Sequence, residues 1–202
     1  DHTGIWELPA DAPVGEDVRK VLHLDDSRFE IKLTPNRGDA LSVVGVARDL
    51  HAVTGAPLTI PAMPAVEATC SCTEPVHIEA PELCGRFTGR VIRGLNAKAP
   101  PPQSMKDRLE RSGQRSISAL VDFSNSVMLE LGRPTHCFDL KKVKGDLTVR
   151  WAKDGETIKI LNEETVKLDP YYGVICDENG PEAIAGIMGG DAPAISAETT
   201  DI

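Results

Sequence analysis

The clearest folding signal in the chain is a hairpin pattern at residues 174–190, Val174-Ile175-Cys176-Asp177-Glu178-Asn179-Gly180-Pro181-Glu182-Ala183-Ile184-Ala185-Gly186-Ile187-Met188-Gly189-Gly190. Asn179-Gly180 is a strong turn signal because both residue types tolerate positive φ angles. The apolar run at 174–176 predicts the strand before the turn, and residues 183–190 predict the returning strand. The pattern therefore indicates an antiparallel pair of strands.

Further strands are predicted outside this hairpin. Alternation of apolar and polar residues indicates strands at residues 30–34, 147–151 and 158–160, and the run at 86–92 indicates another. Between them, residues 59–75 are rich in Pro, Ala, Ser and Thr, which is typical of a linker. We therefore expect a domain boundary in this linker.

Three helices are predicted from their end signals. The first begins near Asp39 and ends at Gly55, the second begins at a Ser104/Asp107 capping pair and ends at Gly113, and the third spans about 118–131. The buried stripe of the third helix should comprise Leu120, Phe123, Val127 and Leu131. Because βαβ alternation is nearly absent, the sequence favours an α+β fold with mixed or antiparallel sheets and a few helices.

Composition limits the classes of function. The 202 residues carry a net charge of −9, which disfavours unspecific binding to nucleic acid. Residues 86–115 are an exception, with eight basic and two acidic residues and hence a local charge of +6. This stretch could be a solvated surface or a patch that faces phosphate groups. No apolar run approaches the ~20 residues that span a bilayer, so no membrane segment is expected.

The number and spacing of the cysteines do not suggest a disulfide framework. Their number is five, and no C-x-x-C pair occurs among them. Cys70 and Cys72 are too close for an ordinary bridge within one extended strand, so we expect free thiols and neither a disulfide nor a zinc site. The chain starts without Met and stops at Ile202 without a recognisable closing element, so we expect a piece of a longer protein.

The segment from Arg115 to Asp139 contains the most suggestive polar residues. His136 follows the third predicted helix, where a neutral imidazole could accept a proton from water. Taken alone, a histidine in such a place more often makes a structural hydrogen bond, and Arg115 more often joins a surface ion pair. Mononucleotide, dinucleotide and nucleophile-elbow motifs are absent from the sequence.

Six short strings, in this order and spacing, resemble the bacterial phenylalanine–tRNA ligase beta-subunit family. They are Leu33-Thr34-Pro35-Asn36-Arg37-Gly38-Asp39, Gly45-Val46-Ala47-Arg48-Asp49, Arg115-Ser116-Ile117, Leu129-Glu130-Leu131-Gly132, Pro134-Thr135-His136 and Ala185-Gly186-Ile187-Met188-Gly189-Gly190. The resemblance covers essentially the whole chain. It implies that residues 1–22 end an OB-fold tRNA-binding insert, 23–61 form the second half of a small domain, 62–79 are a linker, and 80–202 form a C-terminally incomplete editing domain.

The resemblance also implies a site that hydrolyses tyrosine wrongly attached to the phenylalanine tRNA. The family's pocket residues correspond to Arg115, Ser124, Asn125, Pro134, His136 and Gly189. His136 would position or deprotonate water, Ser124 and Asn125 would bind the amino acid or ribose, and Gly189 would leave room for the ring. No metal or cofactor is expected at this site. The family's glutamate that recognises the tyrosine hydroxyl would fall just beyond Ile202, so the isolated chain should be inactive.

For the parent enzyme, the resemblance implies a cytoplasmic heterotetramer. Its partners would be the phenylalanine tRNA and a catalytic alpha subunit, which would perform ATP- and magnesium-dependent charging. The alternative from another class is a non-catalytic module that docks RNA or a subunit. Convergence of His136, Asn125 and Gly189 on one pocket would favour the hydrolytic reading.

Overall fold

The computed structural model describes residues 4–5 and 7–202, in two compact units, Asp1–Thr34 and Pro35–Ile202. The described part of the first unit is irregular apart from the short helix α1 (Val18–Val21), which Asp17 caps. The strand predicted at residues 30–34 is wrong. No strand pairs with these residues anywhere in the described chain, and their neighbour Phe29 remains exposed, so alternation alone does not make a strand.

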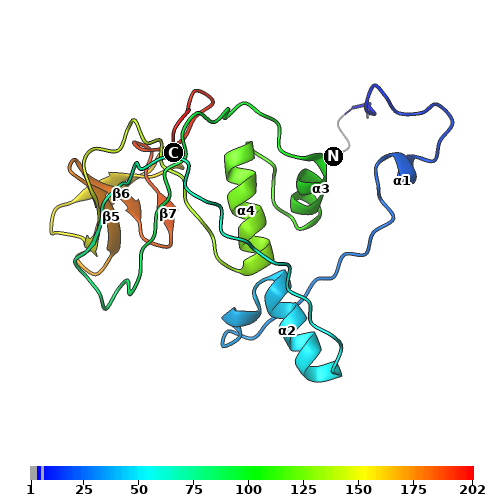
Figure 1. Cartoon of the computed structure of the whole chain (residues 1–202), viewed down its shortest axis with the longest axis horizontal. Coiled ribbons are helices and arrows are strands. Elements are labelled where there is room, and N and C mark those ends of the chain that lie inside the picture. The colour runs from blue at the N-terminus through cyan, green and yellow to red at the C-terminus, as the bar shows by residue number, and fades with distance from the viewer. Residues whose placement is uncertain (1–3, 6) are drawn as a thin grey trace. The chain divides into compact units, whose positions relative to one another are not determined.

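A five-stranded sheet forms the second unit's centre, in the order β1-β2-β5-β6-β7 (Figure 1). Its strands are Val76–Ile78 (β1), Leu147–Trp151 (β2), Gly173–Asp177 (β5), Gly180–Ile184 (β6) and Met188–Gly189 (β7). The β1–β2 pair is parallel and the others are antiparallel. A separate antiparallel pair, β3 (Thr157–Lys159) and β4 (Thr165–Lys167), contributes Ile158 and Val166 to the main apolar core, which also includes Leu168, Val174 and Ile184.

The predicted hairpin is confirmed with two adjustments. The tight turn is formed by Glu178 and Asn179, and Gly180, at φ +133°, already begins β6. The predicted returning strand is divided into β6 and β7 because the chain turns at Gly186, whose φ is +72°. The α+β class with mixed and antiparallel pairing is confirmed.

The predicted helices exist, with corrected starts. They are α2 (Val43–Thr54), preceded by the 3-10 turn η1 (Gly38–Ala40), α3 (Gln103–Arg111) and α4 (Ala119–Leu131). Ser42, rather than Asp39, caps α2 by accepting a hydrogen bond from the Gly45 N–H at 2.9 Å. Pro102 occupies the N-cap of α3, so Ser104 and Asp107 lie inside that helix and do not cap it.

The buried face of α4 differs from the predicted stripe. Phe123 and Leu131 are exposed, whereas Ala119 and Asp122 are buried. Asp122 is buried because its carboxylate accepts hydrogen bonds from the Ser116 hydroxyl (2.6 Å) and the Ile117 N–H (2.9 Å). A hydrogen-bonded acid is therefore buried on α4, whereas the adjacent Phe123, which the apolar pattern placed in the core, is exposed.

Residues 86–92 do not form the predicted strand. The segment is irregular, and regular pairing is limited to an isolated bridge between Arg93 and Asp201. Ile92 and Ile202 also exchange backbone hydrogen bonds of 2.8 and 2.9 Å. These few backbone hydrogen bonds do not make up the continuous ladder that a β-strand requires.

The expectation that all five cysteines are free thiols is wrong. The structure joins Cys70 to Cys72 in a disulfide, with their Cα atoms 5.6 Å apart. The chain bends at Thr69 and Cys70 instead of running as an extended strand, so the two side chains come together. Cys84, Cys137 and Cys176 are free.

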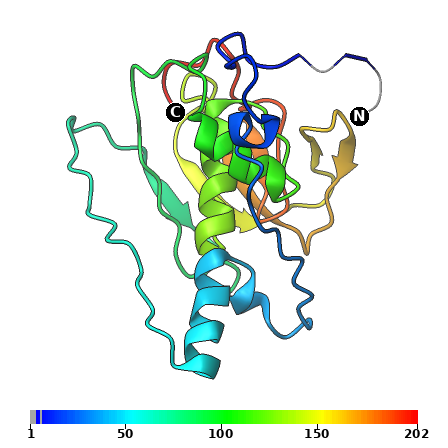
Figure 2. The same ribbon diagram turned by 90° about the vertical axis from the view of Figure 1, so that its right-hand side faces the viewer.

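Residues 55–75 form an irregular connection between α2 and β1. Figure 2 shows this connection running along the outside of the second unit, where Arg90 hydrogen-bonds it at Val66 and Glu67. The domain boundaries inferred from the resemblance stay predictions. Among the described residues, no helix is both long and apolar enough to cross a bilayer.

Glu182 is a buried acid beside the β5–β6 ladder, where the strand register shifts between Ile175 and Cys176. Its Oε2 atom has no hydrogen-bond partner. Burial raises the pKa of Glu182 to about 7, and the neighbouring Asp177 carboxylate adds to the increase. Glu182 is therefore about half protonated in the folded chain at pH 7 and increasingly protonated below it.

Replacement of Glu182 by glutamine should remove a pH-dependent loss of stability. Because the folded-state pKa is about 7 and that of the unfolded chain is about 4.5, the unfolded chain binds fewer protons between these values, so stability falls as the pH rises through the window. We expect Glu182→Gln to match the parent chain near pH 4 and to exceed its unfolding free energy by up to roughly 3 kcal/mol at pH 8. Urea unfolding at both pH values measures this, with exposed Glu164→Gln as control. If the unfolding free energies of the Glu182→Gln variant and the parent changed equally with pH, the raised pKa of Glu182 would be contradicted.

Candidate functional site

The best candidate site is centred on His136, which follows α4 in a segment without regular structure. The imidazole lies against the backbone of Gly189 in β7. A Cβ atom on Gly189 would lie 2.5 Å from His136 Cε1, 2.9 Å from Nε2 and 3.3 Å from Leu161 Cδ1. The absence of a side chain at Gly189 is therefore what allows the histidine to approach the sheet.

The surroundings of His136 favour its neutral form. Phe138 packs edge-on against the imidazole, with ring centroids 4.6 Å apart. Although part of the side chain remains open to solvent, desolvation lowers the pKa of His136 below its ordinary value. Within residues 4–5 and 7–202, neither ring nitrogen makes a hydrogen bond to protein. The imidazole is thus available to accept a proton from water at neutral pH.

Ser124 connects α4 to the histidine segment. Its hydroxyl donates to the Thr135 carbonyl oxygen at 2.6 Å, and the Thr135 hydroxyl donates to Ser124 Oγ at 3.0 Å. Because the Ser124 hydroxyl already donates its hydrogen bond to Thr135, it can only accept a hydrogen bond from a ligand. These bonds hold the residue before His136 against the helix.

A buried hydrogen bond holds the chain just after His136. Asp139 Oδ2 accepts from the Thr199 hydroxyl at 2.7 Å, and both residues are buried. The Asp139 N–H also donates to the Pro193 carbonyl oxygen at 2.9 Å, and Phe138 bridges to Ala194. The histidine segment is therefore fixed on both sides, by α4 before it and by residues 193–199 after it.

The structure does not bring the remaining predicted site residues into contact with His136. Pro134 is exposed two residues before His136, and Asn125 is half-buried on α4. Arg115 is exposed and is held only indirectly, through the bonds that Ser116 and Ile117 make to Asp122. In the described part of the chain, no side-chain hydrogen bond or ion pair joins Asn125 or Arg115 to another residue. The structure thus brings together His136, Gly189 and, through Thr135, Ser124.

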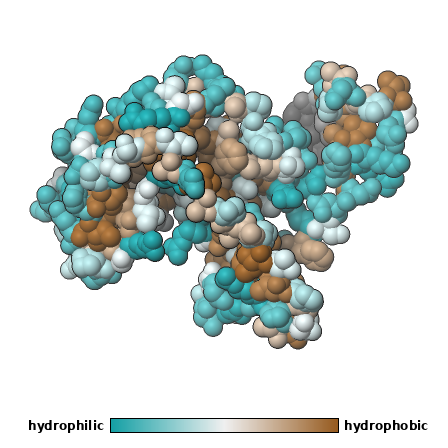
Figure 3. Space-filling view, viewed as in Figure 1, coloured by the Kyte–Doolittle hydropathy of each residue, from teal (hydrophilic) through white to brown (hydrophobic). Residues whose placement is uncertain are grey.

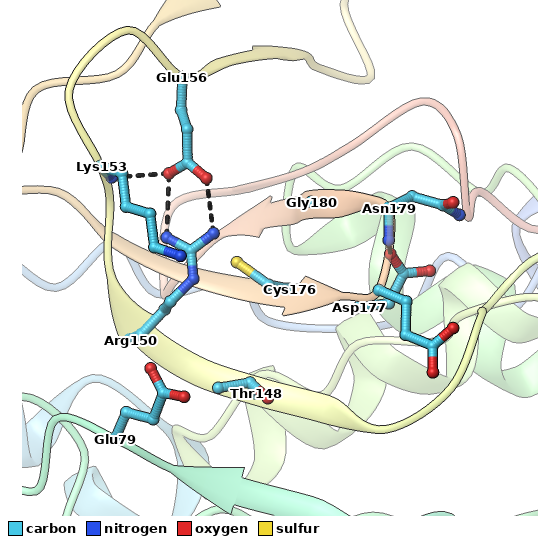
Figure 4. Close-up of a pocket in the computed structure, with 10 residues that line it drawn as sticks. Glu79, Thr148, Arg150, Lys153, Glu156, Cys176, Asp177, Asn179 and Gly180 are labelled. Atoms are coloured by element: carbon cyan, nitrogen blue, oxygen red, sulfur yellow. Dashed lines mark hydrogen bonds and ion pairs between the residues drawn. The ribbon is translucent and has the colours of Figure 1, made fainter.

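A separate cavity of about 300 Å³ lies against β2 and β5, and none of the predicted site residues lines it (Figure 4). Its walls include Glu79, Thr148, Arg150, Glu156 and Cys176. Arg150 binds both carboxylate oxygens of Glu156, at 2.9 and 2.6 Å, so its charge is already neutralised. Burial raises the pKa of Cys176 to about 11, which keeps the thiol protonated. Lys153, whose side chain is exposed, also lines the cavity and leaves a cation there, but the described lining holds no activated nucleophile.

The basic stretch at 86–115 is partly neutralised. Lys98 pairs with Glu198 at 2.7 Å, and Arg111 lies 3.9 Å from Asp107. Arg90 donates to the carbonyl oxygens of Val66 and Glu67 in the linker. Arg86, Arg108 and Arg115 are exposed and remain available to a phosphate group.

The described residues contain no group of three or more His, Cys, Asp or Glu side chains that could hold a metal ion. The titratable group at the candidate site is the imidazole of His136.

Sequence reasoning missed the residues that position the site. They are Asp122, Thr135, Phe138, Asp139 and Thr199. Asp139 could have been suspected because it stands three residues after His136 in a largely apolar segment. Nothing in the sequence indicates that Thr199, 60 residues later, is its partner.

Substitution of Gly189 by alanine should displace the imidazole without unfolding the chain, because the nearest atoms to the new Cβ belong to a side chain. We expect the pKa of His136 to rise toward its ordinary value as the ring moves into solvent. An NMR titration of the His136 ring protons measures this change. Gly85→Ala is the matched control, since no atom lies within 4 Å of its added Cβ. An unaltered His136 titration in the folded Gly189→Ala variant would contradict the contact.

Comparison with known proteins supports a family assignment. The phenylalanine–tRNA ligase beta subunits of Ralstonia nicotianae and Burkholderia lata are each 58% identical to the chain over 202 residues, and that of Bordetella pertussis is 56% identical. Each alignment covers 100% of this chain and 25% of the relative, so the chain spans a quarter of their length. The sequence resemblance to these beta subunits is thus confirmed over the whole chain.

An N-terminal fragment of the phenylalanyl-tRNA synthetase beta subunit from Pyrococcus horikoshii is a more distant structural match. It has 17% sequence identity and a TM-score of 0.45, and the match covers 82% of this chain and 51% of that fragment. The profile of the B3/4 domain family matches residues 83–202, which is more than half of the chain and includes all six predicted site residues. The chain therefore belongs to the B3/4 domain family.

Proposed function

We propose that this chain is part of a phenylalanine–tRNA ligase beta subunit and carries a site that hydrolyses tyrosine mischarged onto the phenylalanine tRNA. The observation that carries the proposal is the His136 imidazole, which desolvation keeps neutral and whose ring nitrogens make no hydrogen bond within the described residues, packed against the backbone of Gly189. The similarity to beta subunits over all 202 residues supports the same assignment.

An enzyme of this kind needs a second site for a physical reason. A binding pocket made for a phenyl ring cannot strongly reject the same ring with an added hydroxyl group. A separate hydrolytic site can discriminate by hydrogen-bonding that hydroxyl, because phenylalanine would leave the site's polar groups without partners. By the family resemblance, the glutamate that makes this bond follows Ile202.

In the proposed reaction, water attacks the carbonyl carbon of the aminoacyl ester. His136 accepts the proton of this water and then delivers a proton to the departing ribose oxygen. The lowered pKa of His136 keeps the imidazole neutral and hence able to begin this cycle at pH 7. The ring's contact with Phe138 limits its rotation, which favours a fixed direction for proton transfer.

Ser124 and Gly189 are proposed to position the substrate. Because the Ser124 hydroxyl donates its hydrogen bond to the Thr135 carbonyl oxygen, the Ser124 oxygen would accept a hydrogen bond from the substrate ammonium or a ribose hydroxyl. The His136 imidazole fills the space that a Gly189 side chain would take, so the tyrosyl ring would lie next to Gly189 on the side of the imidazole that stays open to solvent. Asn125, Pro134 and Arg115 would complete the site after the tRNA end has bound.

The proposed partners follow from the parent enzyme. They are the phenylalanine tRNA, contacted in part by the exposed arginines of the basic stretch, and a catalytic alpha subunit in a heterotetramer. By the family resemblance, ATP and magnesium would serve amino-acid charging on that other subunit. We also propose a cytoplasmic location for the parent enzyme.

A second candidate function is a docking module without chemistry. The observation that favours it is the apolar surface of α2, where Val43, Leu50 and Val53 are 66%, 58% and 85% exposed. Figure 3 shows apolar surface over this helix. Such a face is typical of a surface that another protein segment covers. Docking and hydrolysis can coexist, and the test below separates them.

In the reconstituted parent enzyme, His136→Ala should lower hydrolysis of Tyr-tRNA by roughly 10²-fold or more, because the proton acceptor is lost. Phenylalanine charging should be nearly unchanged. Deacylation of preformed Tyr-tRNA, followed over time, gives the rate directly. His77→Ala is the matched control, since His77 is exposed and pairs with Asp146 away from the site. Undiminished hydrolysis by the His136→Ala enzyme would rule out His136 as the proton acceptor.

A further inference from the structure

The linker between α2 and β1 contains a pair of sulfur atoms that the hydrolytic site does not use. Cys70 and Cys72 form a disulfide that encloses only Ser71. Their Cα separation of 5.6 Å is within the usual range for a bridge. Because the closed loop is so short, the bridge removes little chain entropy and cannot be a major source of stability. Its place in the structure therefore suggests chemistry rather than a structural bridge.

The position of the pair makes it accessible. Cys70 is exposed and Cys72 is half-buried, in a segment without regular structure. Arg90 fixes the linker before the pair by donating to the carbonyl oxygens of Val66 and Glu67. The Leu147 N–H fixes it after the pair by donating to the Pro75 carbonyl oxygen at 3.0 Å. The bridge thus closes a ring in a short exposed segment that is held at both ends.

The other cysteines do not share these properties. Cys176 is buried, and burial raises its pKa to about 11. Burial also raises the pKa of the half-buried Cys137. The Cys84 thiol donates to the Arg86 carbonyl oxygen at 3.3 Å. None of these three has another cysteine bonded to it, so a reversible disulfide within the described residues is confined to the linker pair.

We propose that Cys70-Ser71-Cys72 is a redox-active dithiol that exchanges with low-molecular-weight disulfides such as glutathione disulfide. From the reduced form, the Cys70 thiolate attacks one sulfur of glutathione disulfide, forms a mixed disulfide and releases one glutathione thiolate. The Cys72 thiolate then attacks the Cys70 sulfur and releases the second glutathione thiolate. Two electrons pass from the protein to glutathione disulfide, and the two thiol protons end on two glutathione molecules.

The exposed position also predicts easy reversal. Accessible disulfides are attacked readily by external thiols, and such bridges are more oxidising than buried structural ones. Both forms should therefore be populated within the range of ratios that mixtures of reduced and oxidised glutathione cover. The ring would open and close in the linker while the contacts of His136 stay as they are.

The test uses the full-length protein that contains this chain, equilibrated with glutathione mixtures from fully reduced to fully oxidised. Free thiols are then blocked by alkylation, and the protein is cut after glutamate. The fragment from Ala68 to Glu79 contains Cys70 and Cys72 and no other cysteine. As the glutathione mixture becomes more oxidised, mass spectrometry should show that this fragment changes from the doubly alkylated form to an unalkylated form. The unalkylated form should be about 2 Da lighter than the free dithiol. Cysteines 84, 137 and 176 should stay alkylated across the same mixtures.

Matched variants separate the two chemical steps. Cys72→Ser should stop the reaction at the mixed disulfide, so the fragment should carry one glutathione on Cys70. Cys70→Ser should react more slowly, because Cys72 is less exposed. A parent fragment that remains doubly alkylated in glutathione disulfide, or that remains bridged in excess reduced glutathione, would overturn the proposal. Tyr-tRNA hydrolysis is measured separately, so its failure would not bear on this result.

Discussion

The close approach of His136 to the backbone of Gly189 links the two halves of the candidate site, one on the segment after α4 and one on the sheet. A side chain at position 189 would occupy the space of the imidazole, with its Cβ 2.5 Å from Cε1. The approach is maintained by bonds on both sides of the histidine. Ser124 holds Thr135 before it, and Thr199 holds Asp139 after it. The histidine itself makes no hydrogen bond to the described part of the chain, so its nitrogens are left for water and substrate.

Burial, rather than a charge partner, is the main cause of the pKa shifts of His136 and Glu182. Desolvation lowers the pKa of His136 and raises that of Glu182, in each case favouring the neutral form. At the candidate site this supplies a proton acceptor at neutral pH. At the β5–β6 ladder it leaves an acid whose ionisation opposes folding. The Arg150–Glu156 pair is different, because two opposite charges compensate each other in the wall of the adjoining cavity.

The local part of the fold could be predicted from the sequence. Turn residues and apolar runs identified the β5–β6 hairpin, and end signals identified α4, because both elements are stabilised by neighbours in the chain. The strands expected at 30–34 and 86–92 failed because a strand needs a partner that alternation does not reveal. The carboxylate of Asp122 replaced an expected apolar contact for the same reason. Its hydrogen-bonding partners become evident only in three dimensions.

The sequence motifs predicted individual residues of the candidate site, but they did not predict how these residues are arranged. Family strings pointed to His136 and Gly189, and the structure places them in contact. They did not reveal the bond between Asp139 and Thr199, since it joins residues 60 positions apart. The bridge between Cys70 and Cys72 was also missed, because the bend at Thr69 has no strong sequence signal.

A crystal structure of the full-length protein with a non-hydrolysable amide analogue of tyrosyl-adenosine tests the central claim most directly. The account predicts that the tyrosyl ring lies over Gly189 and that the carbonyl group lies within about 4 Å of a His136 nitrogen, with room for one water between them. Binding of the analogue only in the cavity beside Arg150, or at any place from which His136 is remote, would contradict it.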